Sequence, residues 1–160
     1  MKKTLPHIGK RLPKATATVL VVEDDLEVLG VFRAMLEKLG FRVFPAESET
    51  EVFSEYAHSP SKVDVLLIDI GLHGLDSGFR IAANFRAANP TLKVVFTSGR
   101  PAEHFDDPSL IPGFNFLPKP FTFETLARIL ERAGIMFSLA ISFNEVRLHT
   151  IQKLKMIESN

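Results

Sequence analysis

The sequence predicts an α/β fold in which helices cover both faces of a doubly wound, five-stranded parallel sheet. Short apolar runs of strand length alternate five times with segments in which apolar residues recur at helical spacing. This alternation is typical of parallel sheets, whose right-handed crossovers place helices on both faces. The runs are mostly apolar and lack a regular polar alternation, as expected of strands buried on both sides. The predicted strands are residues 18–23, 41–44, 64–69, 93–97 and 114–117.

The segments between these strands carry helix signals. Asp25 is expected to cap the first helix, which runs to Leu39, and Gly40 is expected to end it. Residues 99–112 contain three prolines, so we expect only a short helix there. The other predicted helices are residues 48–57, 79–88 and 123–133.

The chain of 160 residues is predicted to form one domain, residues 18–133, with an extension at each end. Residues 1–17 carry five basic residues and no acidic one, which predicts a flexible basic arm. Residues 134–160 begin with an apolar run and continue with a weak helical pattern. An extension this apolar is expected to pack on the domain, to pair with a second copy as a homodimer, or to aggregate.

Composition excludes several classes of site and partner. Nineteen basic residues balance nineteen acidic ones, so net charge gives no reason to expect binding to DNA or to an anionic membrane. The absence of cysteine excludes disulfides and thiolate metal sites, and the five histidines have no metal-ligand spacing. No segment approaches the roughly 18 apolar residues that span a membrane. We therefore expect a cytoplasmic protein.

Acidic residues and a lysine stand where three predicted strands end. Glu23 and Asp24 follow the first strand, Asp69 ends the third and Lys119 follows the fifth. Because the carboxyl ends of parallel strands share one edge of the sheet, these side chains are expected to converge there. Three acids in one place repel one another unless a cation lies among them. The pattern indicates a divalent metal and an anionic group held by the metal and the lysine.

The residue types suit phosphoryl chemistry. A strand-end aspartate such as Asp69 can attack a phosphoryl group and form an acyl phosphate. Mg²⁺ prefers oxygen ligands and takes one or two carboxylates; Asp24, in the turn, is the better direct ligand, while Glu23 could bind through water. Lys119 would contact phosphoryl oxygens, or Asp69 in their absence. The hydroxyl of Ser98 could hydrogen-bond a phosphoryl oxygen.

Four segments that carry these residues resemble the motifs of the receiver domain of two-component response regulators. They are residues 19–25, 66–72, 96–99 and 116–121, and they occur in the order found in that family. The resemblance covers residues 18–133 and implies the flavodoxin-like receiver fold with strand order 2-1-3-4-5. The segments around Ser98 and Lys119 are similar to those of receivers attached to hybrid kinases.

The resemblance also implies roles for the acidic residues. Asp69 would accept a phosphoryl group from a histidine kinase or a histidine phosphotransfer protein in a phosphorelay. Glu23 and Asp24 would hold Mg²⁺, with the backbone carbonyl of Gly71 as a further ligand. Glu23 replaces the aspartate that is commoner at its position, and Gly71 puts no side chain where many members carry one that affects hydrolysis. The lifetime of the phosphoryl group therefore stays open.

A second set of roles concerns the conformational switch. The resemblance implies that Lys119 and Ser98 bind the phosphoryl group, and that the aromatic ring of Phe116 turns inward when Ser98 moves. Such a switch is a population shift of a few kcal/mol. The short helix expected in residues 99–112 departs from the family, so the dimer face that many receivers build there is not assumed. The 27 residues after residue 133 are too few for a DNA-binding output domain.

Two other functions compete with a phosphorylated signalling module. A phosphatase of the haloacid dehalogenase type would also use an aspartate, Mg²⁺ and a lysine, but it carries a second aspartate where this chain has Gly71. A receiver-like interaction domain would need no phosphate, which the intact set of acids, Ser98 and Lys119 argues against. We therefore expect no enzyme beyond phosphorylation and dephosphorylation of Asp69 itself.

Overall fold

Five strands, all paired in parallel, form one sheet in the order β2-β1-β3-β4-β5. The computed structural model describes residues 17–56 and 58–135. The predicted fold class and strand order are both confirmed. The strands are β1 Thr18–Val22, β2 Arg42–Ala46, β3 Val65–Asp69, β4 Lys93–Ser98 and β5 Phe116–Pro118.

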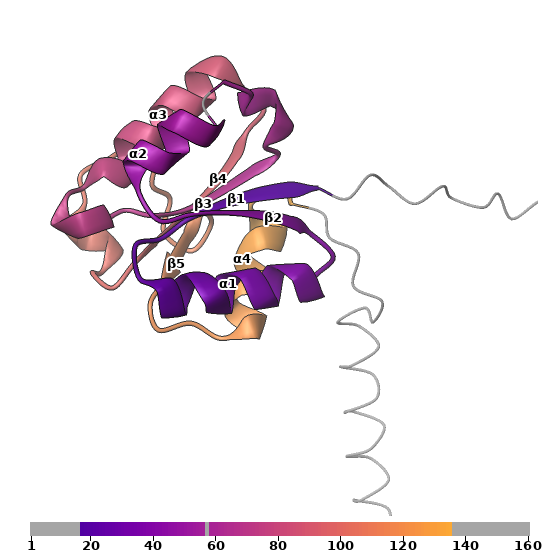
Figure 1. Cartoon of the computed structure of the whole chain (residues 1–160). Coiled ribbons are helices and arrows are strands. Elements are labelled where there is room, and N and C mark those ends of the chain that lie inside the picture. The colour runs from indigo at the N-terminus through magenta and orange to yellow at the C-terminus, as the bar shows by residue number, and fades with distance from the viewer. Residues whose placement is uncertain (1–16, 57, 136–160) are drawn as a thin grey trace, which may run out of the picture.

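Helices cover the two faces of this sheet (Figure 1). Helices α1 (Leu26–Lys38) and α4 (Phe123–Arg132) lie on one face, and α2 (Glu49–Glu51) and α3 (Ser77–Ala88) lie on the other. A π-helical turn, Val52–Tyr56, continues α2. Short 3₁₀ turns are found at Pro60–Lys62, Leu72–Gly74 and Ala102–His104, the last being the short helix expected between β4 and β5.

Alternate residues of the central strands supply two separate cores. Val21 and Leu67 face α1 and α4, whereas Val22 and Ile68 face α3, and all four are fully buried. This alternation is the two-residue period of a β-strand. Complete burial of such a side chain stabilises the fold by about 1.5–3 kcal/mol, so the central strands hold their register strongly.

The ends of α1 follow the expected signals. The side chain of Asp25 accepts hydrogen bonds from the backbone N–H groups of Glu27 (2.9 Å) and Val28 (3.1 Å). At the other end Gly40 has φ 89°, and the N–H of Phe41 donates to the carbonyl of Leu36 at 3.1 Å. This is a Schellman-type ending, which favours glycine at the left-handed position. Helix α1 therefore begins directly beside the carboxyl end of β1.

The predicted limits of β5 were wrong at the start of the strand. Phe114 is 45% exposed and lies in a turn rather than in the sheet. The side chain of Asn115 closes that turn by accepting from the N–H of Ile111 (2.7 Å) and donating to the carbonyl of Ser109 (2.8 Å). The backbone carbonyl of Asn115 already accepts from the N–H of Phe96 in β4 at 2.8 Å, and paired residues of the ladder begin at Phe116.

Strand β2 is longer than predicted, since it continues through Pro45 to Ala46. Proline cannot donate a backbone hydrogen bond, but β2 lies at the edge of the sheet, where one side of the strand needs no partner.

Both ends of the predicted domain extend slightly further than expected. Ala17 packs against the core, and Ile135 is 4% exposed, with its N–H donating to the carbonyl of Leu130 at 2.9 Å. The rest of the predicted basic arm and of the C-terminal extension, with the predicted homodimer contact, lies outside the described residues. Within residues 17–56 and 58–135, no helix has the length and apolar character needed to cross a membrane.

Candidate functional site

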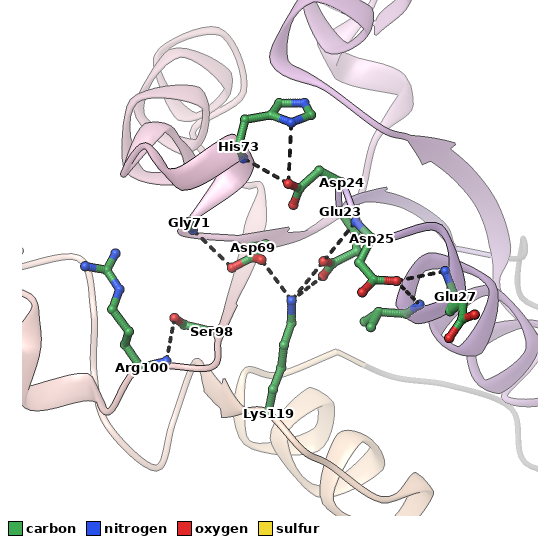
Figure 2. A network of polar contacts seen from close by, with 11 residues as sticks. Glu23, Asp24, Asp25, Glu27, Asp69, Gly71, His73, Ser98, Arg100 and Lys119 are labelled. Carbon is green, nitrogen blue, oxygen red and sulfur yellow. Dashed lines mark hydrogen bonds and ion pairs between the residues drawn. The ribbon is translucent and has the colours of Figure 1, made fainter.

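The polar residues predicted at the strand ends meet at the carboxyl edge of the sheet (Figure 2). Asp69 is the last residue of β3, and Glu23 directly follows the neighbouring strand β1. Lys119 follows β5, where its backbone N–H donates to the carbonyl of Ser98 at 2.8 Å. The peptide bond between Lys119 and Pro120 is cis. The long lysine side chain reaches across from β5 to β3 and β1.

The ammonium group of Lys119 joins two buried carboxylates. Its Nζ donates to Oδ2 of Asp69 and to Oε1 of Glu23, both at 2.8 Å. The side chains of Glu23 and Asp69 are 1% and 11% exposed, and that of Lys119 is 20% exposed. The pairing of Lys119 with Asp69 is the one expected when no phosphoryl group is bound.

The surroundings shift the pKa of both partners of this ion pair. Burial raises the pKa of the Glu23 carboxyl above its ordinary value of 4.5, although the hydrogen bond from Lys119 opposes that shift. Burial acts to lower the pKa of Lys119, but its hydrogen bonds to Asp69 and Glu23 outweigh burial and raise it above 10.5. Lys119 is therefore a fixed positive charge at neutral pH.

Three carboxylates at this edge of the sheet lie close enough together to hold a metal ion. Oxygen atoms of Glu23, Asp24 and Asp69 lie within 4.8 Å of one another. Oε1 and Oε2 of the buried Glu23 carboxylate lie 2.8 and 2.7 Å from Nζ of Lys119. One ammonium group cannot neutralise three carboxylates, and a divalent cation would offset the remaining negative charge. The all-oxygen ligand set fits Mg²⁺.

Backbone N–H groups of the loop after β3 bind the carboxylates of Asp24 and Asp69. The N–H of His73 donates to Oδ2 of Asp24 at 3.0 Å, and Nδ1 of His73 lies 3.4 Å from the same oxygen. The N–H of Gly71 donates to Oδ1 of Asp69 at 3.0 Å. The carbonyl of Gly71, which was predicted to bind the metal, accepts from the N–H of Gly74 and keeps its second lone pair. His73 therefore positions Asp24, a role that nothing in its spacing indicated.

Helix α3 begins almost in contact with the backbone that carries Asp69. A Cβ atom added to Gly78 would lie 2.4 Å from the carbonyl oxygen of Asp69 and 2.8 Å from Cα of Ile70. The N–H of Gly78 also donates to the carbonyl of Ile70 at 3.2 Å. Only glycine allows this approach, so Gly78 helps to fix where Asp69 sits.

Two neighbouring hydroxyl groups lie at the end of β4. The hydroxyl of Ser98, the predicted switch residue, accepts from the N–H of Arg100 at 3.0 Å. Thr97 is the register partner of Asp69, so both side chains leave the sheet on the same face. Oγ1 of Thr97 is buried and has no hydrogen-bond partner among the described residues. Sequence reasoning missed Thr97, because choosing between the two hydroxyls requires the register of β3 and β4.

Phe116, the predicted aromatic switch residue, is buried in the described structure. It is 5% exposed, pairs with Phe96 across β4 and β5, and packs in the core beneath α3. The ring therefore belongs to the buried core of the described structure.

Comparison with known proteins places the chain in a family. The family model of the response regulator receiver domain matches residues 19–131. The chain belongs to this family. Receiver domains bind Mg²⁺ at an acidic cluster and are phosphorylated by histidine kinases, and the cluster described above lies inside the matched residues.

Individual relatives are similar over the same part of the chain. The sensor kinase CckA of Brucella abortus (strain 2308) is 34% identical over 131 residues, which is 76% of this chain and 13% of that protein. A solved response regulator receiver protein from Sinorhizobium medicae WSM419 is 25% identical, with a TM-score of 0.64 over 75% of this chain and 96% of that one. The solved receiver domain of the hybrid histidine kinase CckA is 27% identical, with a TM-score of 0.60 over 75% of this chain and 100% of that one. The similarity to the sensor kinase therefore concerns a small part of that protein.

Proposed function

We propose that Asp69 accepts a phosphoryl group from the phosphohistidine of a histidine kinase or of a histidine phosphotransfer protein. The observation that carries the proposal is the bridge of Lys119 Nζ to Asp69 Oδ2 and Glu23 Oε1, each at 2.8 Å, inside a cluster of three carboxylates. A half-buried ammonium group beside the acceptor supplies a ready contact for phosphoryl oxygens.

In the proposed reaction a carboxylate oxygen of Asp69 attacks phosphorus. The P–O bond of the acyl phosphate forms as the P–N bond of phosphohistidine breaks, and the electron pair of that bond stays on the imidazole nitrogen. The N–H of Gly71 orients the carboxylate through Oδ1. Lys119 transfers its hydrogen bond from Oδ2 to a phosphoryl oxygen, which releases Oδ2 for the attack.

Glu23, Asp24 and Asp69 are the proposed ligands of Mg²⁺, with the carbonyl of Gly71 as a fourth. When bound, this ion supplies positive charge that neutralises the carboxylates and the incoming phosphoryl oxygens. Glu23 is buried and both of its oxygens face Nζ of Lys119, so it is proposed to hold the ion either directly or through water. Asp24 is held by His73 at the rim of the site.

Two hydroxyls are candidates for the phosphoryl contact that drives the switch. Ser98 was predicted for this role, and accepting from the N–H of Arg100 leaves its O–H proton free to donate to a phosphoryl oxygen. The hydroxyl of Thr97 is buried without a partner among the described residues, on the sheet face that carries Asp69. We propose that Ser98 makes the contact, with Thr97 as the alternative donor.

The proposed output is a change in protein contacts or a further phosphorelay step in the cytoplasm, without direct binding to DNA. A phosphatase that turns over external substrates is disfavoured because position 71 offers no carboxylate as general acid; Gly71 contributes only backbone groups. Sustained release of phosphate from small phosphate esters would favour the phosphatase instead.

Calorimetric titration with Mg²⁺ and beryllofluoride, a mimic of the phosphoryl group, tests the proposal. Wild type is expected to bind beryllofluoride only when Mg²⁺ is present, and Asp69→Asn is expected not to bind it. Equal binding by Asp69→Asn, or no binding by folded wild type, would exclude Asp69 as the acceptor.

A further inference from the structure

Arg100 connects the two loops that flank Asp69. Its Nη2 donates to Oδ1 of Asp76, the residue that precedes α3, while Arg100 itself lies in the loop after β4. Its backbone N–H donates to the hydroxyl of Ser98, on the side of the sheet edge where Asp69 lies (Figure 2). Its guanidinium carbon lies 4.6 Å from the ring centroid of Phe105. Arg100 is therefore held beside the site without contacting it.

The bond between Arg100 and Asp76 is one that can be exchanged easily. The two side chains are 50% and 52% exposed. Ion pairs this exposed contribute little net stability, because water competes for both partners. The bridge of Lys119 to Glu23, in which the carboxylate is 1% exposed, is the opposite case. A stronger anion placed near Arg100 could therefore remove it from Asp76.

Asp76 stands where it could cap helix α3, but its side chain bonds to Arg100 instead. It stands at the N-cap of α3 with ψ 43°, and its side chain accepts no hydrogen bond from the first turn. Asp25, at the same position of α1, has ψ 109° and accepts two such bonds. Aspartate is a preferred capping residue because its carboxylate satisfies these N–H groups. Arg100 thus holds the carboxylate of Asp76 away from the helix that it could cap.

We propose that Arg100 is a second phosphoryl-binding cation of this chain. When Asp69 is phosphorylated, the guanidinium exchanges the carboxylate of Asp76 for phosphoryl oxygens, and Asp76 turns to cap α3. This inference rests on the proposed function. A phosphoryl group carries nearly two negative charges and presents three acceptor oxygens, so it competes well against one exposed carboxylate. The exchange couples the state of Asp69 to the first turn of α3 and to the loop after β4.

Opposite effects of two single substitutions test this exchange. Titration of the full chain with Mg²⁺ and beryllofluoride is expected to show binding weakened about three- to tenfold in Arg100→Gln, which loses a charge-assisted contact. Asp76→Asn is expected to bind about twofold more tightly or better, because Arg100 is then freed of its competitor. Arg100→Lys should recover part of the affinity. Arg80→Gln, which breaks the exposed bridge from α3 to Glu49, is the matched control and should bind as wild type does.

Unchanged affinity in Arg100→Gln would overturn the inference, and so would a shift of the same sign in Arg100→Gln and Asp76→Asn. Neither result would affect the proposed function, which fails only if wild type does not bind or if Asp69→Asn binds equally.

Amide hydrogen exchange supplies a second readout. Beryllofluoride is expected to slow exchange in the first turn of α3 in wild type but not in Asp76→Ala, which cannot cap the helix. Equal slowing in both proteins would overturn the release of Asp76.

Discussion

The close approach of α3 to Asp69 makes a quantitative prediction for Gly78→Ala. The added Cβ would lie 2.4 Å from the carbonyl oxygen and 3.1 Å from the carbonyl carbon of Asp69, and 2.8 Å from Cα of Ile70. All three are backbone atoms, so no side-chain rotation can relieve the overlap. Since non-bonded carbon atoms prefer separations of about 3.5–4.0 Å, the helix must move by about 1 Å. Overpacking of this kind costs about 1–3 kcal/mol.

Gly30→Ala is the matched control. Gly30 lies within α1, where an added Cβ would meet no heavy atom within 4 Å. Alanine is favoured over glycine in a helix interior by about 0.5–1 kcal/mol, so this variant should be more stable than wild type. The two substitutions add the same atoms and are expected to shift stability in opposite directions, by about 1.5–4 kcal/mol relative to each other.

Urea unfolding followed by circular dichroism measures this difference through the transition midpoints at constant slope. In thermal melts, each kcal/mol corresponds to about 2–4 °C for a chain of this size. Displacement of the backbone at Asp69 should also weaken Mg²⁺ binding in Gly78→Ala and leave it unchanged in Gly30→Ala. If Gly78→Ala melted at or above the temperature of Gly30→Ala, the reasoning about this contact would be refuted.

Four further substitutions probe the site. Glu23→Gln should weaken Mg²⁺ binding. Because the pKa of Glu23 in the folded state is raised above 4.5, its ionisation destabilises Mg²⁺-free wild type as pH rises from about 4.5 through that pKa. The stability of Glu23→Gln relative to wild type, measured by urea unfolding, should therefore increase from acidic to neutral pH. An equal gain at both pH values would contradict this sign. Thr97→Val removes an unpartnered buried hydroxyl and should raise stability by about 1 kcal/mol in thermal melts, whereas Ser98→Ala loses a bond and should lower it. Lys119→Met leaves two carboxylates without their ammonium partner and should destabilise the Mg²⁺-free protein by about 3 kcal/mol, a loss that added Mg²⁺ should partly restore. No recovery with Mg²⁺ would argue against a metal at this position.

The fold was predictable because its signals are local and agree with one another. Mostly apolar strands alternate with helices that begin at residues such as Asp25 and end at residues such as Gly40, and parallel pairing follows from that alternation. The errors concern elements whose limits depend on tertiary contacts. Phe114 reads as part of a strand until Asn115 is seen to close a turn, and Pro45 ends a strand only if that strand is not at an edge.

The candidate site was predictable in its members but not in their individual environments. Strand ends place Glu23, Asp69 and Lys119 together whatever the details of packing. The burial of Glu23 depends on the side chain of Lys119, which reaches from the end of β5 to the ends of β3 and β1. The spacing of residues in the sequence does not reveal this. Which of Thr97 and Ser98 shares the sheet face of Asp69 depends on side-chain alternation counted from a register that only the paired strands define.

Transfer of one phosphoryl group to one residue tests the central claim most directly. Intact-protein mass spectrometry after incubation with phosphoramidate, whose P–N bond resembles that of phosphohistidine, measures this transfer. We expect a single added phosphoryl group on wild type with Mg²⁺, and none on Asp69→Asn or after removal of Mg²⁺ by a chelator. Equal labelling of wild type and Asp69→Asn, or labelling that does not depend on Mg²⁺, would contradict the assignment of Asp69 as a metal-assisted phosphoryl acceptor.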